Sequence, residues 1–427
     1  VASFNVLNYF TTLDDGSCPY SGGCRGADNA TEFTRQRDKI IAALAEIDAD
    51  VVGLIEIENH PTDAALADLV SGLNAAMGAG TYDYVATGAI GPDVIRVAFI
   101  YKPAFVTPAG NHAVLDAPTF LDPTNTGSAK NRAALAQTFS NNSTGGVFTA
   151  VVNHLKSKGS ACGPGDDDPE QGSCNLTRTL AAQELLNWLS TDPTSSSDED
   201  FLIIGDLNSY DEEDPIDAIV AGGYTDLIFS FNGESAYSYV FDGQLGYLDH
   251  ALASADLVGE VTGLTQWHIN ADEPDLINYD TTFKQPAQED IYAPDAFRSS
   301  DHDPVIIGLD VCDEVAPTFD EVSVTPNVLW PANHKYVDVT ATVTVNDNFD
   351  TNPTLTIVSV TSNEADNGNG DGNTVDDIII VDDFHFMLRA ERSSNGVGSV
   401  YTITYMVTDA CGNYTTATAT VPLNNRR

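Results

Sequence analysis

A helical pattern followed by a wholly apolar strand occurs twice in the first half of the chain. Residues 32–47 carry apolar side chains at helical spacing, and an apolar run follows at residues 51–55 (VVGLI). Residues 177–189 and the run 201–204 (FLII) repeat this order. Strands apolar on both faces must be covered on both faces. We therefore expect two related halves with sheets back to back and helices outside, a four-layered α/β/β/α sandwich.

The pattern changes after residue 311. Residues 337–345, 400–405 and 415–421 alternate with period two, and Thr, Val, Asn and Asp dominate. This style is typical of a small all-β sandwich, immunoglobulin-like in size and pattern. The sequence therefore predicts an α+β chain with two domains, at 1–311 and 312–427.

The chain is strongly acidic, with 63 Asp and Glu against 18 Lys and Arg, a net charge of −45. Such a charge disfavours broad adsorption to DNA or anionic membranes, so a polyanion must be drawn by a local basic patch or bound metal ions. Two explanations stay open: a hydrated, halophilic surface, or many weak cation sites. The acidic segment 364–377 (EADNGNGDGNTVDD) is interpreted as a flexible loop or, alternatively, a weak calcium site.

Six cysteines fall into three pairs, none with the C-x-x-C spacing of a zinc or redox site. Disulfides would place the chain in an oxidising compartment, whereas six free thiols would indicate the cytosol. We expect disulfides and therefore a secreted bacterial protein. A periplasmic location and association with the cell surface are the alternatives. No apolar run is long enough to span a membrane. We expect that a leader peptide, if one existed, has been removed, with missing upstream segments as a further possibility. The expected pairs are Cys18–Cys24, Cys162–Cys174 and Cys312–Cys411.

Polar groups suited to phosphoester chemistry follow the expected strands. Hard cations need oxygen ligands, an attacking water needs a base, and neutral amides or imidazoles can stabilise the charged transition state. After His154, Lys156 and Lys158 alternate, which favours a phosphate-facing loop, although a structural histidine is an equal alternative. The candidate residues in chain order are Asn5, Glu56, His154, Asp206, Asn208, Asp249, Asp301 and His302.

The order of these motifs resembles the endonuclease/exonuclease/phosphatase superfamily, which includes deoxyribonuclease I-like nucleases, abasic-site endonucleases and sphingomyelinases. Residues 2–10 (ASFNVLNYF), 205–210 (GDLNSY) and 247–252 (YLDHAL) look most like its secreted bacterial extracellular nucleases. The resemblance covers nearly all of residues 1–311.

The resemblance implies a role for each candidate. Glu56, with Asn5 and Asp301, would hold the main cation, Mg²⁺ or Mn²⁺, and Ca²⁺ is the candidate structural ion. Asp206 and Asn208 would orient water and phosphate or hold a second cation. His302, paired with Asp249, would act as general base or as a phosphate-stabilising acid.

The remaining site residues concern phosphate and substrate. His154 would bind a phosphate oxygen or assist the leaving group. Asp93 is the candidate carboxylate partner of His154. In the alternative, Asp93 is a turn residue and the partner of His154 is unidentified. Arg96 is a substrate contact or a surface charge. The predicted substrate-binding residues are Lys130, Asn131, Arg132, Lys156 and Tyr239. Tyr239 would stack on a base, with aromatic packing in the core as the alternative.

The implied function is a secreted, metal-dependent nuclease. Loops select the substrate, so the same core can serve other phosphoesters. The alternatives are a phosphomonoesterase, a lipid or small-molecule phosphodiesterase, and a non-catalytic binding protein. DNA is preferred to RNA as substrate. We expect a monomer whose C-terminal domain binds a surface or polymer.

Overall fold

The computed structural model describes residues 1–367, 372, 374–393 and 398–424. It divides into two compact units, one of residues 1–143 and 147–311, the other of residues 144–146 and 312–427. The first is a mixed α/β unit and the second is all-β, as expected. That the units fold as independent domains stays a prediction. Among the described residues, no helix combines the length and apolarity needed to cross a bilayer.

The first unit contains two six-stranded sheets, in the orders β13-β14-β1-β2-β4-β3 and β5-β6-β7-β8-β12-β9. The strands of the first sheet are β1 (Ala2–Tyr9), β2 (Val51–Glu58), β3 (Asp83–Tyr84), β4 (Ile95–Tyr101), β13 (Val261–Gln266) and β14 (Val305–Leu309). Those of the second are β5 (Val106–Leu115), β6 (Ala134–Asn141), β7 (Val147–His154), β8 (Phe201–Asp206), β9 (Thr225–Asp226) and β12 (Asp249–Ala253). A hairpin of β10 (Tyr239–Phe241) and β11 (Gln244–Gly246) stands apart from both sheets.

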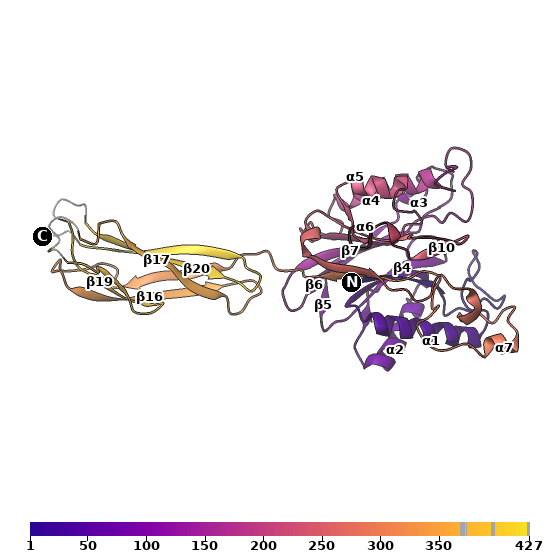
Figure 1. Ribbon diagram of the computed structural model, residues 1–427, viewed down its shortest axis with the longest axis horizontal. Coiled ribbons are helices and arrows are strands. Elements are labelled where there is room, and N and C mark those ends of the chain that lie inside the picture. The colour runs from indigo at the N-terminus through magenta and orange to yellow at the C-terminus, as the bar shows by residue number, and fades with distance from the viewer. Residues whose placement is uncertain (368–371, 373, 394–397, 425–427) are drawn as a thin grey trace. The chain divides into compact units, whose positions relative to one another are not determined.

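The helices cover the outer faces of the two sheets, and Figure 1 shows the resulting layers. Helices α1 and α2 lie on the side of the first sheet, and α4 and α5 on the side of the second. The helices are α1 (Ala30–Ile47), α2 (Ala64–Met77), α3 (Pro118–Leu121), α4 (Asn175–Leu189), α5 (Asp214–Ala221), α6 (Leu227–Asn232) and α7 (Pro286–Glu289). Short 3₁₀ turns lie at Gly233–Ser235, Leu257–Glu260 and Asp275–Ile277.

Strand β2 shows why the layers form. Its alternate residues face opposite sides, so Val51 and Ile55 enter the core between the sheets. Val52 and Leu54 instead enter the core beneath α1 and α2. Burying each such side chain contributes on the order of 1.5–3 kcal/mol.

Gly53 lets the two sheets approach closely. A Cβ at this position would lie 2.6 Å from Ile204 Cδ1 on β8 and 3.2 Å from Val152 Cγ2 on β7. Gly53 therefore packs against Ile204, which lies two residues before Asp206, the last residue of β8.

The start of α1 is fixed by Asn29, whose side chain accepts hydrogen bonds from the amides of Thr31 and Glu32. The helix ends where Asp48 adopts a left-handed conformation. Its inward face then packs Ile40 and Leu44 against the first sheet.

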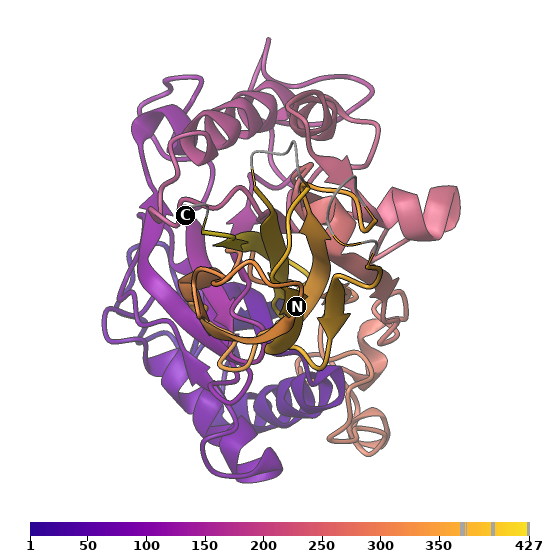
Figure 2. The ribbon, with the colours of Figure 1, turned by 90° about the vertical axis from the view of Figure 1, so that its left-hand side faces the viewer.

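The second unit consists of two antiparallel sheets, ordered β15-β16-β19-β18 and β17-β20-β21, and Figure 2 shows it end-on in yellow and orange. Their strands are β15 (Thr318–Thr325), β16 (Tyr336–Asn346), β17 (Thr354–Ser362), β18 (Ile378–Ile380), β19 (His385–Arg389), β20 (Val400–Thr408) and β21 (Tyr414–Pro422). Alternate residues such as Leu388 and Ile403 form the core between them. The immunoglobulin-like classification stays a prediction. Segment 364–377 lies partly outside the described residues.

All three expected disulfides are present: Cys18–Cys24, Cys162–Cys174 and Cys312–Cys411. The first two close short surface loops, and the third joins the beginning of the second unit to the turn before β21. Each can restrict the unfolded chain and thereby stabilise the folded one.

Arg96 corrects one interpretation of the sequence, because it is neither a substrate contact nor a surface charge. Its side chain is 1% exposed and lies 2.6 Å from Asp63, whose side chain is 9% exposed. Asp63 also accepts a hydrogen bond from the Gly88 amide. The pair thus ties β4 to the start of α2.

Removing one charge of this pair should destabilise the first unit. We expect Asp63→Asn to lower its free energy of unfolding by roughly 3–5 kcal/mol, because Arg96 would be left buried and uncompensated. Hydrogen exchange of the slowest amides in β2 and β4 measures this free energy for the first unit alone. The exposed Asp116 offers a matched control, and Asp116→Asn should leave exchange unchanged. Equal exchange in both variants would contradict the assignment.

Candidate active site

Three predicted residues lie side by side on the second sheet. The parallel register of β7 and β8 places His154 opposite Asp206, and the antiparallel register of β12 and β8 places Asp249 opposite the same residue. Gly205, with φ of +124°, permits this arrangement, because a Cβ there would lie 2.1 Å from the Asn153 carbonyl oxygen. We call His154, Asp206 and Asp249 the strand-end row.

The first sheet contributes Glu56 through an irregular pairing of its strands. The register shifts between Asn5 and Tyr9 on β1 and between Leu54 and Ile57 on β2. Within these shifts Asn8 and Glu56 have left-handed φ values of +52° and +67°. A bulge changes the direction of a side chain, and residues in this conformation are strained by about 1–2 kcal/mol.

The two sheets meet around a cavity of about 280 Å³. His154 Nε2 lies 3.5 Å from Asp206 Oδ2 and 3.9 Å from Glu56 Oε1, so the imidazole lies between carboxylates of both sheets. The lining residues are Asn8, Arg25, Glu56, Arg132, His154, Ser157, Asp206, Asn208, Tyr239, Leu248, Asp301 and His302.

His302 and Asp249 form a buried pair, with His302 Nδ1 and Asp249 Oδ2 2.7 Å apart. The Ser238 hydroxyl donates a second hydrogen bond to Asp249 Oδ2 at 2.8 Å. The Tyr239 ring lies over the imidazole, with centroids 4.6 Å apart. These contacts fix the ring so that Nε2 faces Asp206 Oδ2 at 4.0 Å.

The two histidines have opposite protonation preferences. Burial lowers the pKa of His302, but the charge and hydrogen bond of Asp249 outweigh burial and hold this pKa well above its ordinary value. Burial and the nearby charges of Arg132 and His302 hold the pKa of His154 well below its ordinary value. At neutral pH the site therefore combines a cationic His302 with a neutral His154.

Asp206 can change protonation near neutral pH. Burial raises its pKa to about 7, which the His302 charge opposes and the Asp249 charge assists. The Asn208 amide donates to Asp206 Oδ1 at 2.9 Å, and the Asn208 side chain donates to the Leu155 carbonyl at 3.1 Å. Asn208 thus holds the Asp206 carboxylate in place.

The donor groups on the Glu56 side of the cavity fit a hard divalent cation. Burial and the Asp301 charge raise the pKa of Glu56, so a cation between these carboxylates would relieve both effects. Asn8 Oδ1 is buried without a hydrogen-bond partner in the same lining. Carboxylate and amide oxygens suit Mg²⁺ or Mn²⁺ rather than zinc.

Asn5 is placed differently from the other predicted metal ligands. Its Oδ1 accepts a hydrogen bond from the Leu7 amide, and its Nδ2 lies 3.5 Å from Asp206 Oδ2. It lies behind the cavity lining and joins the two sheets, while Asn8 lies in the lining. Its role as a metal ligand stays a prediction.

The predicted substrate contacts divide into two groups. Arg132 and Tyr239 line the cavity, whereas Lys130 does not. The structure corrects the prediction for Asn131, which is 2% exposed and does not line the cavity. Its side-chain Nδ2 donates a hydrogen bond to the Phe120 carbonyl, and its Oδ1 accepts one from the Lys156 amide. Lys156 also lies outside the lining, because its ammonium donates to the Ser157 carbonyl and the Ser160 hydroxyl.

The structure also corrects the prediction that Asp93 is the carboxylate partner of His154, because Asp93 pairs with two arginines instead. Its carboxylate lies 3.0 Å from Arg132 Nε and 3.2 Å from Arg25 Nη2. Arg25, in the lining, follows Cys24 of the first disulfide. Asn8, Arg25, Ser157 and Ser238 were not predicted as site residues. Asn8 lies within the motif of residues 2–10 and Ser157 lies between Lys156 and Lys158, so the sequence carried a signal near both, whereas Arg25 has none.

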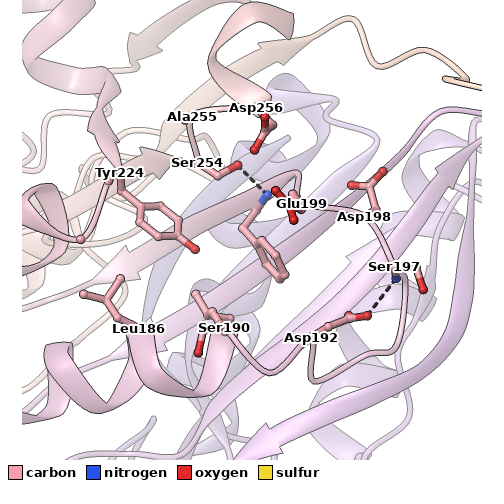
Figure 3. A pocket seen from close by; sticks show the side chains of 14 residues that line it. Leu186, Ser190, Asp192, Ser197, Asp198, Glu199, Tyr224, Ser254, Ala255 and Asp256 are labelled. Carbon is pink, nitrogen blue, oxygen red and sulfur yellow. Dashed lines mark hydrogen bonds between the residues drawn. The ribbon is translucent and has the colours of Figure 1, made fainter.

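A larger cavity of about 470 Å³ lies at the opposite end of β8 and is shown in Figure 3. Its lining includes Asp192, Asp198, Glu199 and Asp256 together with Tyr224. All of its lining belongs to the described part of the chain and contains no basic side chain or histidine. It lacks the groups that phosphoester chemistry requires.

Comparison with known proteins agrees with this geometry. Residues 2–302 match the model of the endonuclease/exonuclease/phosphatase family. The chain belongs to this family. Its enzymes hydrolyse phosphoester bonds and are generally dependent on divalent metal ions. No curated protein sequence matches the chain significantly.

Solved structures also show similarity to this chain. A family member from Bacteroides thetaiotaomicron is 17% identical over 73% of this chain and 94% of its own, with a TM-score of 0.47. A mannosyl-6-phosphatase from the same organism is 18% identical over 72% and 98%, with a TM-score of 0.46. The human Nocturnin catalytic domain with bound sulfate is 15% identical over 73% and 94%, with a TM-score of 0.44.

The His302–Asp249 pair can be tested by titration. Because the pair raises the pKa of His302 above the unfolded value of about 6.5, its stabilisation is complete below that pH and is lost as pH rises through the raised pKa. We expect Asp249→Asn to lower the pKa of His302 in metal-free protein, as measured by NMR of the imidazole protons.

Asp226→Asn is the matched control, since Asp226 lies 3.8 Å from Nδ1 of the buried His250. Asp226 raises the pKa of His250 against the effect of burial, so this variant should lower the pKa of His250 and leave His302 unchanged. An unchanged His302 titration in folded Asp249→Asn would show that another group raises its pKa.

Proposed function

We propose that this protein is a secreted, divalent-metal-dependent nuclease that hydrolyses phosphodiester bonds of extracellular DNA. The observation that carries the proposal is the convergence of His154, Asp206, His302, Glu56 and Asp301 on one cavity, with Asp249 hydrogen-bonded to His302. Its resemblance to secreted bacterial extracellular nucleases, based on the motifs of residues 2–10, 205–210 and 247–252, supports the choice of substrate.

The pKa shifts of His302, Asp206 and His154 suggest which part of the hydrolysis each residue performs. A cationic His302, held by Asp249, favours stabilising a phosphate oxygen over accepting a proton. Asp206, with a pKa of about 7, is suited to accept the proton of an attacking water. The water oxygen would form a bond to phosphorus as the ester P–O bond breaks. Neutral His154 would accept a hydrogen bond at Nε2 from Arg132 Nη1, 3.3 Å away, and so hold this guanidinium near the leaving oxygen.

A bound Mg²⁺ or Mn²⁺ would polarise the phosphate and offset charge in the transition state. Glu56 and Asp301 would hold this cation, with Asn8 Oδ1 available beside them. Asn5, predicted as a metal ligand, would support the site through the hydrogen bond that its Nδ2 donates to Asp206 Oδ2. 

Arg25 and Arg132 provide the local positive charge that a strongly acidic protein needs to bind a polyanion. Asp93 holds both guanidinium groups at the cavity. Tyr239, whose ring is tilted by 32° against the His302 imidazole, offers an aromatic face in the cavity lining.

A phosphomonoesterase or small-molecule phosphodiesterase is the second candidate. The net charge of −45 and the internal bonding of Asn131 and Lys156 favour it, because they limit the basic surface available to a long polyanion.

Three disulfides support the proposed secretion. A monomer with a surface-binding second unit remains the proposed organisation.

A substrate panel separates the two functions. With Mg²⁺ or Mn²⁺ the wild-type protein should cleave plasmid DNA, and EDTA should abolish cleavage. His302→Ala should lower the rate by about 10²–10⁴-fold, because it removes a positioned acid–base group. His112→Ala, a change on β5 outside the cavity lining, should retain full activity. Intact DNA beside rapid hydrolysis of a chromogenic monoester would establish the second candidate instead.

The second unit should be dispensable for hydrolysis. A chain ending at residue 311 keeps every residue of the cavity lining, so we expect it to cleave a small diester at the full-length rate. Cleavage kinetics and circular dichroism of the truncated and full-length proteins test this expectation. Loss of activity in a truncation that is folded by circular dichroism would show that the units depend on each other.

A further inference from the structure

The hairpin of β10 and β11 begins at the catalytic cavity and ends in an exposed turn. Tyr239, the first residue of β10, lines the cavity, and its ring centroid lies 4.6 Å from that of His302. Phe241, the last residue of β10, is 66% exposed. The hairpin thus places one aromatic side chain in the cavity lining and a second one in solvent.

Tyr239 and Phe241 lie on the same face of the hairpin, and we call them the hairpin aromatic pair. Alternate residues of a strand share a face, and the Cα atoms of two such residues are at most about 7 Å apart. In the antiparallel register, Gly246 lies opposite Tyr239. Gln244 lies opposite Phe241, so Leu245 points to the other face, where it is 58% exposed.

The turn that follows Phe241 has two residues, Asp242 and Gly243, with φ values of +50° and +76°. A two-residue hairpin turn favours positive φ at both positions, because this conformation matches the twist of the strands. The tip is therefore short, and Phe241 projects from a paired strand and not from a long loop.

The base of the hairpin is bonded to the catalytic residues. Ser238, directly before β10, donates from its hydroxyl to Asp249 Oδ2 at 2.8 Å. Its carbonyl accepts from the Asp303 amide at 2.8 Å, and its amide donates to the Gly246 carbonyl at 3.0 Å. Asp249 is the partner of His302, which directly precedes Asp303. The position of the hairpin aromatic pair is thus fixed relative to the catalytic residues.

We propose that Phe241 stacks on an unpaired nucleobase next to the scissile phosphate. The inference rests on the proposed nuclease function and deepens it, because it makes single-stranded DNA, or the frayed end of a duplex, the preferred substrate. An aromatic side chain can stack on any base, since every base has a π face. Within a duplex each base is stacked on its neighbours, and exposing it costs unstacking energy.

Stacking also suits the charge of this chain. The protein carries 63 acidic against 18 basic residues, and two arginines line the cavity. Phosphate contacts alone therefore give it little affinity for a polyanion. Stacking adds affinity without positive charge, on the order of 5–150-fold per base.

The competing explanation is that the tip of the hairpin contacts a lipid surface. Phe241 and Leu245 are exposed on opposite faces of the tip. Insertion into lipid would use both side chains, whereas base stacking would use only the face that Phe241 shares with Tyr239. The variants Phe241→Ala and Leu245→Ala therefore distinguish the two explanations.

The test compares two single-stranded substrates of equal length in the presence of Mg²⁺. One is oligothymidylate, and the other carries the same phosphates on stable abasic (tetrahydrofuran) units without bases. We expect Phe241→Ala in the full-length protein to raise KM for oligothymidylate about tenfold, because a stacking contact is lost. The kcat and the KM for the abasic strand should stay unchanged.

Leu245→Ala is the matched control, since Leu245 is similarly exposed on the other face of the same hairpin, and this variant should retain both KM values. Phe241→Tyr keeps an aromatic ring and should retain the KM for oligothymidylate. If Phe241→Ala fails to fold, Phe241→Leu, which keeps an apolar side chain without a ring, should raise the same KM.

Two outcomes would overturn the inference while DNA hydrolysis, and with it the proposed function, stands. One is an unchanged KM for oligothymidylate in folded Phe241→Ala or, where that variant is unfolded, in Phe241→Leu. If Phe241→Ala and Leu245→Ala then both lose binding to phosphatidylcholine vesicles, the tip contacts lipid instead. The other outcome is an equal rise in KM for the abasic strand, which would indicate a structural role.

Failure of the proposed function has a different signature. Wild-type protein that leaves oligothymidylate and plasmid DNA intact, but hydrolyses a chromogenic monoester, would refute the nuclease function and this inference together.

Discussion

The close contact between β2 and β8 determines where the polar groups of the first unit can lie. Gly53 leaves room for Ile204, so the backbones of the two sheets approach at this point. A few residues further along, Glu56 and Asp206 leave the apolar core on facing strands. His154 then lies within 4 Å of both carboxylates. The apolar packing thereby places like charges close together, and the arginines and a metal ion would offset their repulsion.

Much of this fold could be predicted because each strand carries a local pattern. The apolar strands, the alternating strands of the second unit and the cysteine pairs all followed from sequence. The helices began two residues earlier than expected, at Ala30 and Asn175, because capping positions carry a weak sequence signal. The buried side of α4 was less predictable. Ala181 and Leu185 face the sheet, whereas Trp188 is half-buried, because a closely packed helix places small residues inward.

The site was predictable where its residues end strands and unpredictable where loops supply them. Strand register brings His154, Asp206 and Asp249 together, and the order of motifs identified all three. Arg25 enters the cavity from a disulfide loop without any periodic signal. Asp93 was the candidate carboxylate partner of His154, yet its partners are two arginines that only the folded chain brings near.

The strand-end row also affects how such a protein can vary. Because adjacent residues of a strand face opposite sides, a shift of β8 by one residue would turn Asp206 away from both neighbours at once. Insertions within this strand would therefore separate His154, Asp206 and Asp249 in one event. The loops around the cavity have no such constraint and can change length separately. Changes in single loops can thus alter which phosphoester fits the cavity. The relative positions of His154, Asp206 and Asp249, in contrast, are kept or lost together.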